Sequence, residues 1–265
     1  MPADRRDAAA TGSAERFGYE WHEYAELRPE YEEQFRRWTV LLPPAEWRGR
    51  SFLDVGCGMG RNSYWAVKWG AAPGLAIDID SRSLEAAKRT LAASPNIAVE
   101  TRSAYEVGER DRFDIVFSIG VIHHLAEPET ALRNMVTAAK PGGRVLIWVY
   151  GLENNRWIVW LINPLRKALL SRLPIGLVHH LSLYPAAVLW LALKLGLGRI
   201  AYLKLMRSWT FRHLRSVMFD QMLPRISNYW SKAEVERLMR GSGLEAVELA
   251  WVNELSWCAL GRKPA

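Results

Sequence analysis

The chain has 265 residues, of which 49% are hydrophobic and 24% are charged, a composition typical of a globular protein with one large core. This composition excludes a fibre, a disordered chain and a disulfide-stabilised miniprotein. The two cysteines, Cys57 and Cys258, lie far apart and match no zinc-ligand spacing, so we expect a reducing compartment and no metal site.

The net charge of +7 is unevenly distributed along the chain. Residues 151–225 contain eleven Lys or Arg residues and only two acidic residues, so this segment carries +9 and the remainder carries −2. The same segment holds four tryptophans and long aliphatic stretches. We therefore expect a basic, apolar insertion within a mildly acidic body.

The beginning of the chain predicts a tail followed by a helix. Residues 1–16 are charged, rich in small residues and without the apolar run of a secretory signal, which predicts a disordered tail and a cytoplasmic protein. Farther on, Tyr31, Phe35 and Trp38 recur at helical spacing with charges between them. This spacing predicts an amphipathic helix that ends before two prolines.

Short apolar runs then alternate with helical patterns. Strands are predicted at 51–55, 74–78, 97–100, 113–118 and 144–150. One helix is predicted after the glycine loop and ends at residue 70, and two others span 83–91 and 128–140. Pro141, Gly142 and Gly143 are expected to separate the last helix from its strand. Such alternation predicts right-handed βαβ units, and hence a doubly wound α/β fold with a mostly parallel sheet. The carboxyl ends of its strands form one crevice.

The end of the chain is expected to complete this core. Ser231 and Glu234 predict a capping box at the start of a helix, and the apolar runs 244–252 and 255–262 predict an antiparallel hairpin. The predicted organisation is a tail (1–16), a core with an amino-terminal lid segment (17–150), a helical insertion after the fifth strand (151–225), and a terminal helix and hairpin that complete the core (226–265).

A glycine loop follows the first predicted strand. In the sequence DVGCGMG, Gly56, Gly58 and Gly60 let the backbone turn sharply and approach a ligand closely. Asp78 ends the second predicted strand, where a carboxylate accepts hydrogen bonds from a ribose diol. The spacing departs from the dinucleotide pattern, and Asp54 beside the loop would repel a pyrophosphate. These features predict an adenosine-type cofactor with a positive charge.

The chain from residue 17 to residue 262 resembles the Rossmann-like (class I) S-adenosylmethionine-dependent methyltransferases. The resemblance is carried by FLDVGCGMGRN, GLAID, FDIVFSIGVIHHL and PGGRVLIWVYG, together with the terminal hairpin. It implies a seven-stranded sheet and S-adenosyl-L-methionine as cofactor. The GVIHHL stretch and the segment Phe17, Gly18, Tyr19 and Trp21 look most like bacterial small-molecule methyltransferases, including those of quinone biosynthesis.

The resemblance also implies a set of cofactor-binding residues. Asp54 and the glycines would surround the methionyl part, Asp78 the ribose, and Ser103 occupies the place where the family often has an acid that contacts adenine. Tyr19 and Trp21 would belong to a lid, or alternatively pack their rings on the core. We interpret Cys57 as a small buried thiol without a redox role. The full predicted set is Tyr19, Trp21, Asp54, Gly56, Cys57, Gly58, Gly60, Asp78, Ile79, Ser103, Ala104 and Ser118.

Two histidines follow the fourth predicted strand, at the edge of the crevice. A histidine there is suited to act as general base toward a phenol or alcohol, so His123 and His124 are the predicted catalytic residues, with His124 preferred. The alternative is that they cap the next helix or pack against the cofactor. A carbon or amine acceptor needs less help from a base, so the histidines do not identify the acceptor atom.

The insertion contains 21 residues, 173–193, without a single Asp, Glu, Lys or Arg. One membrane crossing is rejected, because strands of one sheet lie before and after this stretch. Two alternatives remain: a buried lid over the substrate, or an apolar face at the inner membrane surface with basic residues on anionic headgroups. Nucleic acid ranks third, since these cations alternate with aliphatic residues.

The leading hypothesis is a methyltransferase acting on a small, apolar or lipid-like acceptor, without a metal. The alternatives are a catalytically silent partner protein that binds S-adenosylmethionine, an RNA methyltransferase, and a nicotinamide-dependent oxidoreductase. The glycine spacing and Asp54 count against the last of these.

Overall fold

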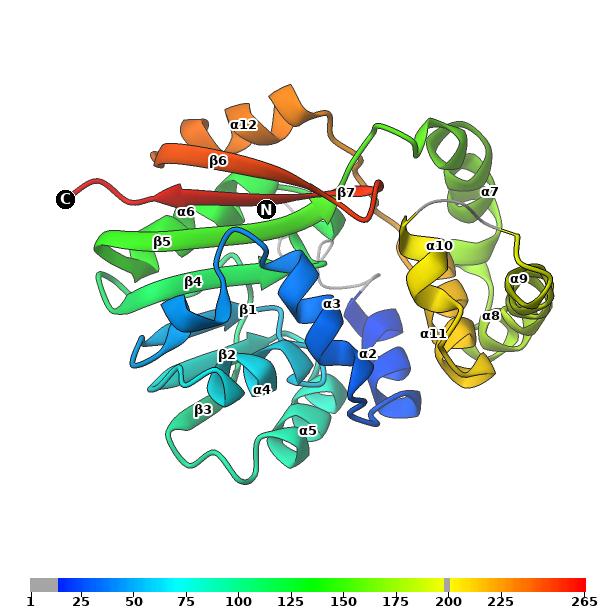
Figure 1. The fold of residues 1–265 in the computed structure, drawn as a ribbon, viewed down its shortest axis with the longest axis horizontal. Helices are drawn as coiled ribbons and strands as arrows, with labels where there is room; N and C mark the ends of the chain where they lie inside the picture. The colour runs from blue at the N-terminus through cyan, green and yellow to red at the C-terminus, as the bar shows by residue number, and fades with distance from the viewer. Residues whose placement is uncertain (1–13, 198–200) are drawn as a thin grey trace, which may run out of the picture.

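A seven-stranded sheet runs through the centre of the computed structural model, which describes residues 14–197 and 201–265 (Figure 1). The strand order is β3-β2-β1-β4-β5-β7-β6. The strands are β1 (Phe52–Val55), β2 (Gly74–Asp78), β3 (Ile97–Thr101), β4 (Phe113–Ile119), β5 (Ala139–Tyr150), β6 (Glu245–Val252) and β7 (Ser256–Arg262). The sheet confirms the predicted Rossmann-like α/β fold.

Strands β1 to β5 are parallel, and β7 pairs antiparallel with both β5 and β6. The terminal hairpin is therefore confirmed. Asn253 and Glu254 in its turn both have positive φ, 52° and 62°, as the right-handed twist of a tight hairpin favours. The strand order reverses between β1 and β4, and in such sheets the ligand crevice lies at the carboxyl ends beside this reversal.

Helices cover both faces of the sheet, because successive strand residues point to opposite sides. On one face, Phe52 belongs to a core shared with α3 (Glu30–Trp38) and α4 (Arg61–Lys68), and α5 (Ser81–Thr90) packs beside them. On the other face, Leu53 belongs to a core shared with α6 (Pro128–Ala138) and α12 (Lys232–Gly241). The predicted capping box begins α12, where the carboxylate of Glu234 accepts the Ser231 backbone N–H at 2.7 Å.

Two local predictions differ from the structure. Helix α2 (Ala14–Glu23) begins inside the segment predicted as a tail, because the buried Arg16 donates to the carbonyls of Leu170 and Leu223 and ties the helix to the insertion. The rest of that segment, residues 1–13, lies outside the described residues. Strand β5 begins at Ala139, so the Pro-Gly-Gly sequence is part of the strand, where the pairing with β4 is irregular.

The insertion is helical and lies beyond the carboxyl ends of the strands (Figure 1). Helix α2 contacts both α5 of the core and α11 of the insertion, so it connects the two parts. Arg199, one of the eleven basic residues of the segment 151–225, lies outside the described residues. The elements are η3 (Ile158–Ile162), α7 (Asn163–Ala168), η4 (Leu170–Arg172), α8 (Ile175–Leu181), α9 (Leu183–Lys194), α10 (Ala201–Met206) and α11 (Phe211–Met222).

Candidate active site

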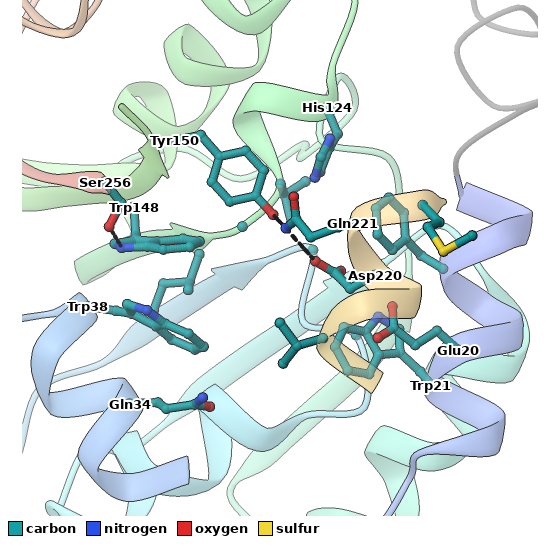
Figure 2. Close-up of a pocket in the computed structure, with 18 of the residues that line it drawn as sticks. Glu20, Trp21, Gln34, Trp38, His124, Trp148, Tyr150, Asp220, Gln221 and Ser256 are labelled. Atoms are coloured by element: carbon teal, nitrogen blue, oxygen red, sulfur yellow. Dashed lines mark hydrogen bonds between the residues drawn. The ribbon is translucent and has the colours of Figure 1, made fainter. Parts of the chain in front are cut away.

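A cavity of about 1150 Å³ lies between the carboxyl ends of the strands, α2 and the insertion. We call one part the loop end; it is lined by Gly56, Cys57, Gly58, Asp78, Ile79, Ser103 and Ala104. We call the other part the aromatic end; it is lined by Tyr229 and by five residues labelled in Figure 2, namely Trp38, Trp148, Tyr150, Asp220 and Gln221. The two ends belong to one continuous space, so a ligand at the loop end adjoins a ligand at the aromatic end.

The glycine loop forms the floor of the loop end. Gly56 and Gly58 have φ values of 80° and 54°, which side chains rarely adopt. A Cβ at Gly56 would come within 2.4 Å of Val121, and one at Gly58 within 2.9 Å of the Trp21 indole nitrogen. Gly60 begins α4 in a left-handed conformation but does not line the cavity. Glycine is therefore required at Gly56 and Gly58, both of which line the cavity, because the backbone there packs closely against Val121 and Trp21.

Asp78 stands at the tip of β2, next to the glycine loop. Its Oδ2 accepts the Gly58 backbone N–H at 2.9 Å, and its Oδ1 accepts the Asp80 backbone N–H at 3.0 Å. Burial raises the pKa of Asp78, while these backbone hydrogen bonds oppose the rise. Each carboxylate oxygen has a second lone pair for a ligand hydroxyl, so a ribose diol fits this position.

Asp54 lies beneath the loop and does not line the cavity, although the sequence predicted contact with the cofactor. Its Oδ2 accepts a hydrogen bond from Ser63 Oγ at 2.7 Å, whereas Oδ1 is buried without a partner among the described residues. Burial raises the pKa of Asp54 to about 7. A cationic ligand on the loop above would stabilise the carboxylate form, so the unpartnered oxygen fits S-adenosylmethionine.

This buried acid predicts a stability effect that depends on pH. Since the pKa of Asp54 is raised in the folded state, its contribution to stability is complete below pH 3.8 and is lost as pH rises through about 7. We expect Asp54→Asn to raise the free energy of unfolding at pH 8, by up to about 4 kcal/mol, and to change it little at pH 4. Denaturant unfolding at the two pH values measures this. A variant less stable than the wild type at pH 8 would contradict it.

Two predicted cofactor-binding residues point away from the cavity. Ser118 is buried in the central strand β4, and its hydroxyl donates to the Val55 carbonyl at 2.7 Å. It therefore has no access to the crevice. Tyr19 packs its ring against Phe219, with the ring centroids 5.9 Å apart. Trp21 does line the cavity, and since it lies two residues along the same helix from Tyr19, the two rings point to different sides.

The turn after β3 lines the cavity with more residues than the sequence predicted. Ser103 and Ala104 are there, as expected, and Ser103 Oγ accepts the Tyr105 backbone N–H at 3.2 Å. Glu106, three residues beyond Ser103, also lines the cavity. An acid is therefore present near the predicted adenine position, displaced by the turn that begins at Ser103.

The two histidines have different positions. His123 is fully buried, does not line the cavity, and lies against Tyr150 with 3.9 Å between ring centroids, so the structure does not bring this predicted catalytic residue to the cavity. His124 lines the cavity, and its Nδ1 lies 2.8 Å from the Ile226 carbonyl oxygen, which makes Nδ1 the donor. Burial lowers the pKa of His124 to about 4, so at neutral pH it is a neutral imidazole and a weak base.

An acidic cluster at the aromatic end was not predicted from the sequence. Figure 2 shows Asp220 and Gln221 of α11 facing Tyr150 of β5, with Glu20 of α2 nearby. Tyr150 donates to Asp220 Oδ2 at 3.4 Å, and Gln221 Nε2 donates to the Tyr150 hydroxyl at 2.8 Å. Burial raises the pKa values of Asp220 and Glu20, and the neighbouring Asp220 carboxyl raises that of Glu20 further. Raised pKa values make the cluster suited to take up and hold a proton more readily than exposed acids do.

Arg61 balances this cluster electrostatically. Its guanidinium lies over the rings of Trp21, Tyr31 and Trp38, at 4.9, 4.8 and 5.2 Å from their centroids. The same charge lowers the pKa of Glu20 and that of Asp220, against the effect of burial. Arg61 opens the helix after the glycine loop, so it connects the loop end to the aromatic end.

The sequence matches known methyltransferases over part of its length. Residues 53–147 match the family described as Methyltransferase domain (Methyltransf_11). A tRNA U34 carboxymethyltransferase of Hahella chejuensis is 30% identical over 42% of this chain and 36% of that protein. A ubiquinone biosynthesis O-methyltransferase of Nitrosospira multiformis is 30% identical over 51% of this chain and 56% of that protein. The chain thus spans about a third to a half of these curated relatives.

The fold resembles that of a solved methyltransferase over its whole length. The structure of 1,6-didemethyltoxoflavin-N1-methyltransferase from Burkholderia thailandensis, with bound 1,6-didemethyltoxoflavin and S-adenosylhomocysteine, covers 100% of this chain and 92% of that chain. The TM-score is 0.60 and the identity 16%, so this likeness concerns the fold. Residues 53–147 therefore match a methyltransferase domain, and the chain around them has the Rossmann-like fold of the class I S-adenosylmethionine-dependent methyltransferases.

Proposed function

We propose that this protein transfers a methyl group from S-adenosyl-L-methionine to a small, apolar or lipid-like acceptor bound at the aromatic end of the cavity. The observation that carries the proposal is the continuity of the cavity from the glycine loop to a wall of aromatic and aliphatic side chains. Such a chamber favours an apolar molecule with a few polar groups. We place the protein in the cytoplasm, in keeping with the fold.

The loop end would hold the cofactor with residues of β1, β2 and the loops that follow them. Asp78 would accept hydrogen bonds from the ribose hydroxyls, and the backbone of Gly56 to Gly58 would border the methionyl part. When bound, S-adenosylmethionine supplies an electrophilic methyl group on a sulfonium. The chain's own contribution is to align the acceptor and to exclude water from the reacting groups.

The aromatic end would orient and deprotonate the acceptor. Trp148 is held by a hydrogen bond from its indole nitrogen to Ser256 Oγ at 3.0 Å, and Trp38 lies against it with 5.0 Å between ring centroids. A flat acceptor fits against these fixed rings. For a hydroxyl acceptor, Asp220 would take the proton as the new oxygen–methyl bond forms and the sulfur–methyl bond breaks, leaving a neutral thioether. Asp220 replaces the predicted His124 because burial raises the pKa of the Asp220 carboxyl, which strengthens it as a base, whereas burial lowers the pKa of His124 and weakens it as a base.

A small acceptor is favoured over RNA by the position of the basic residues. The cations of the insertion accompany exposed aliphatic and aromatic side chains, whereas single-stranded RNA is usually bound in a polar, basic groove with stacking rings. The relative that acts on tRNA matches the chain over less than half its length.

Labelled S-adenosylmethionine and a bacterial metabolite extract test the proposal. The purified chain is incubated with both, and labelled products are identified by mass spectrometry after separate extraction into water and into organic solvent. We expect a labelled product of low molecular mass that partitions into the organic phase. Label found only in RNA would favour the RNA methyltransferase, and cofactor binding without any labelled product would favour a silent binding protein.

A further inference from the structure

Exposed apolar side chains are concentrated on the insertion. Trp160, Val188, Leu195 and Leu161 have relative exposures of 77%, 71%, 69% and 68%, whereas core apolar side chains are mostly buried. Outside the insertion, the exposed large apolar residues of the described chain are Val40, at 51%, and Ile79, at 41%. A surface so rich in exposed apolar residues marks a site of interaction.

On α9 these residues form a continuous stripe. Tyr184, Val188, Leu191 and Leu195 are all exposed and are spaced at intervals of four, three and four residues. That spacing places them on one face of an α-helix. The helix turns Ala186 and Leu193 toward the protein, where both are buried. The stripe on the opposite side is exposed, and its ring contact in the described chain is that of Tyr184 with His180 of α8.

Basic residues flank these exposed apolar residues along the sequence. Arg156, Lys167, Arg172 and Lys194 are exposed and form no ion pair with another described residue. They flank the exposed residues of η3, α7 and α9 in the sequence. Apolar side chains bordered by unpaired cations match the interface of an anionic bilayer, where rings and aliphatic groups enter the headgroup region and cations contact phosphates.

The topology of the sheet does not allow this stretch to cross a membrane once. The stretch Ile175–Lys194 is helical and is long and apolar enough to span a bilayer, and only 17% of its most apolar window is buried in the protein. However, β5 precedes it and β7 follows it, and these two strands pair in one sheet. A single crossing would separate them, so the helix can meet a bilayer only from one side.

We infer that this apolar and basic face of η3, α7 and α9 docks on the surface of an anionic phospholipid bilayer. Trp157 and Leu165 are each more than half exposed on this face and also line the cavity, so the cavity wall reaches the docked surface. On the basis of the proposed function, an apolar acceptor reaches the aromatic end from the bilayer. Docking itself requires no methyl transfer, so it is measured separately.

Vesicle flotation with the full chain tests the docking surface. The protein is mixed with vesicles of phosphatidylglycerol or of phosphatidylcholine at low salt, and the floated fraction is measured. We expect binding to phosphatidylglycerol that weakens as salt is added, and much weaker binding to phosphatidylcholine. Trp160→Glu and Val188→Glu are each expected to reduce vesicle binding about tenfold, because each replaces an apolar side chain that would enter the bilayer with a charged one. Neither residue lines the cavity, so cofactor binding should be unaffected.

Val40→Glu is the matched control, because it adds the same charge at an apolar residue that is 51% exposed outside the insertion. It should bind vesicles like the wild type. S-adenosylhomocysteine binding by calorimetry, unchanged in Trp160→Glu, shows that this variant is folded. Failure of the wild type to float with phosphatidylglycerol overturns the inference, as does an equal loss in Val40→Glu. A stable dimer in solution that buries Trp160 would also overturn it, by assigning the face to a second copy.

Discussion

Asp220→Asn should lower kcat by a factor of roughly 100 to 10,000 while leaving S-adenosylhomocysteine affinity within about threefold of the wild type. The substitution keeps the size of the side chain, so the hydrogen bond from Tyr150 is retained, but it removes the group that takes up the proton. Because Asp220 lies at the aromatic end, away from the glycine loop, cofactor binding should not depend on its charge. Turnover with the acceptor found in the extract experiment, together with calorimetry, measures both quantities.

The pH profile distinguishes a proton acceptor from a structural residue. Burial raises the pKa of Asp220 in the folded protein, so its basic form gains population as pH rises, and wild-type kcat should increase with pH above the usual titration range of an aspartate. The residual activity of Asp220→Asn should lose this dependence. Neutralising a buried acid whose pKa is raised should also leave unfolding at pH 8 no easier than in the wild type.

Asp111→Asn serves as a control, because it neutralises an exposed acid that pairs with Lys263 far from the cavity. Its kcat should match that of the wild type. If Asp220→Asn has wild-type kcat and an unchanged pH profile, Asp220 takes no proton in the reaction. His124→Gln provides the comparison for the competing base, and we expect its effect on kcat to be smaller.

Asp78→Asn should weaken S-adenosylhomocysteine binding by roughly 100-fold, or about 3 kcal/mol. An amide in place of the carboxylate accepts at one oxygen only, so it must abandon either the Gly58 or the Asp80 backbone N–H. It also removes the negative charge that strengthens hydrogen bonds from the ribose. Calorimetric titration of the folded variant measures the change in affinity.

Asp80→Asn is the matched control for this measurement. Asp80 caps α5 by accepting the Arg82 and Ser83 backbone N–H groups, and Asn caps helices as well as Asp does. The substitution therefore removes a nearby negative charge while keeping the local structure, and affinity should change less than threefold. An equal loss in both variants would mean that overall charge near β2, rather than the Asp78 position, controls binding.

Much of the fold follows from patterns that are local in the sequence. Strand β2 has the predicted bounds, Gly74–Asp78, because an apolar run between turn residues has few alternatives. Boundaries were wrong where distant contacts decided them. Arg16 extends α2 into the predicted tail through bonds to the insertion, and β5 gains residues at its start because β4 pairs with them.

Distant contacts also decided which way single side chains face. Asp78 and Trp21, both predicted from the sequence, line the cavity, but the sequence grouped Trp21 with Tyr19, and His124 with His123, as members of one predicted site. Neighbours in a chain differ in which side they face, and that is set by the elements packed around them. His123 is turned against Tyr150, whereas His124 meets the cavity and the Ile226 carbonyl.

By itself, the sequence determined the loop end of the cavity, because a strand, a glycine turn and an acid at the tip of the next strand all lie within residues 52–78 and follow from short-range backbone geometry. Only the tertiary structure decided the aromatic end. Its acids and tyrosine come from α2, β5 and α11, with Tyr150 and Asp220 separated by 70 positions. Their chemistry depends on burial among one another, which raises the pKa of each acid, and no pattern of neighbouring residues encodes that loss of solvent.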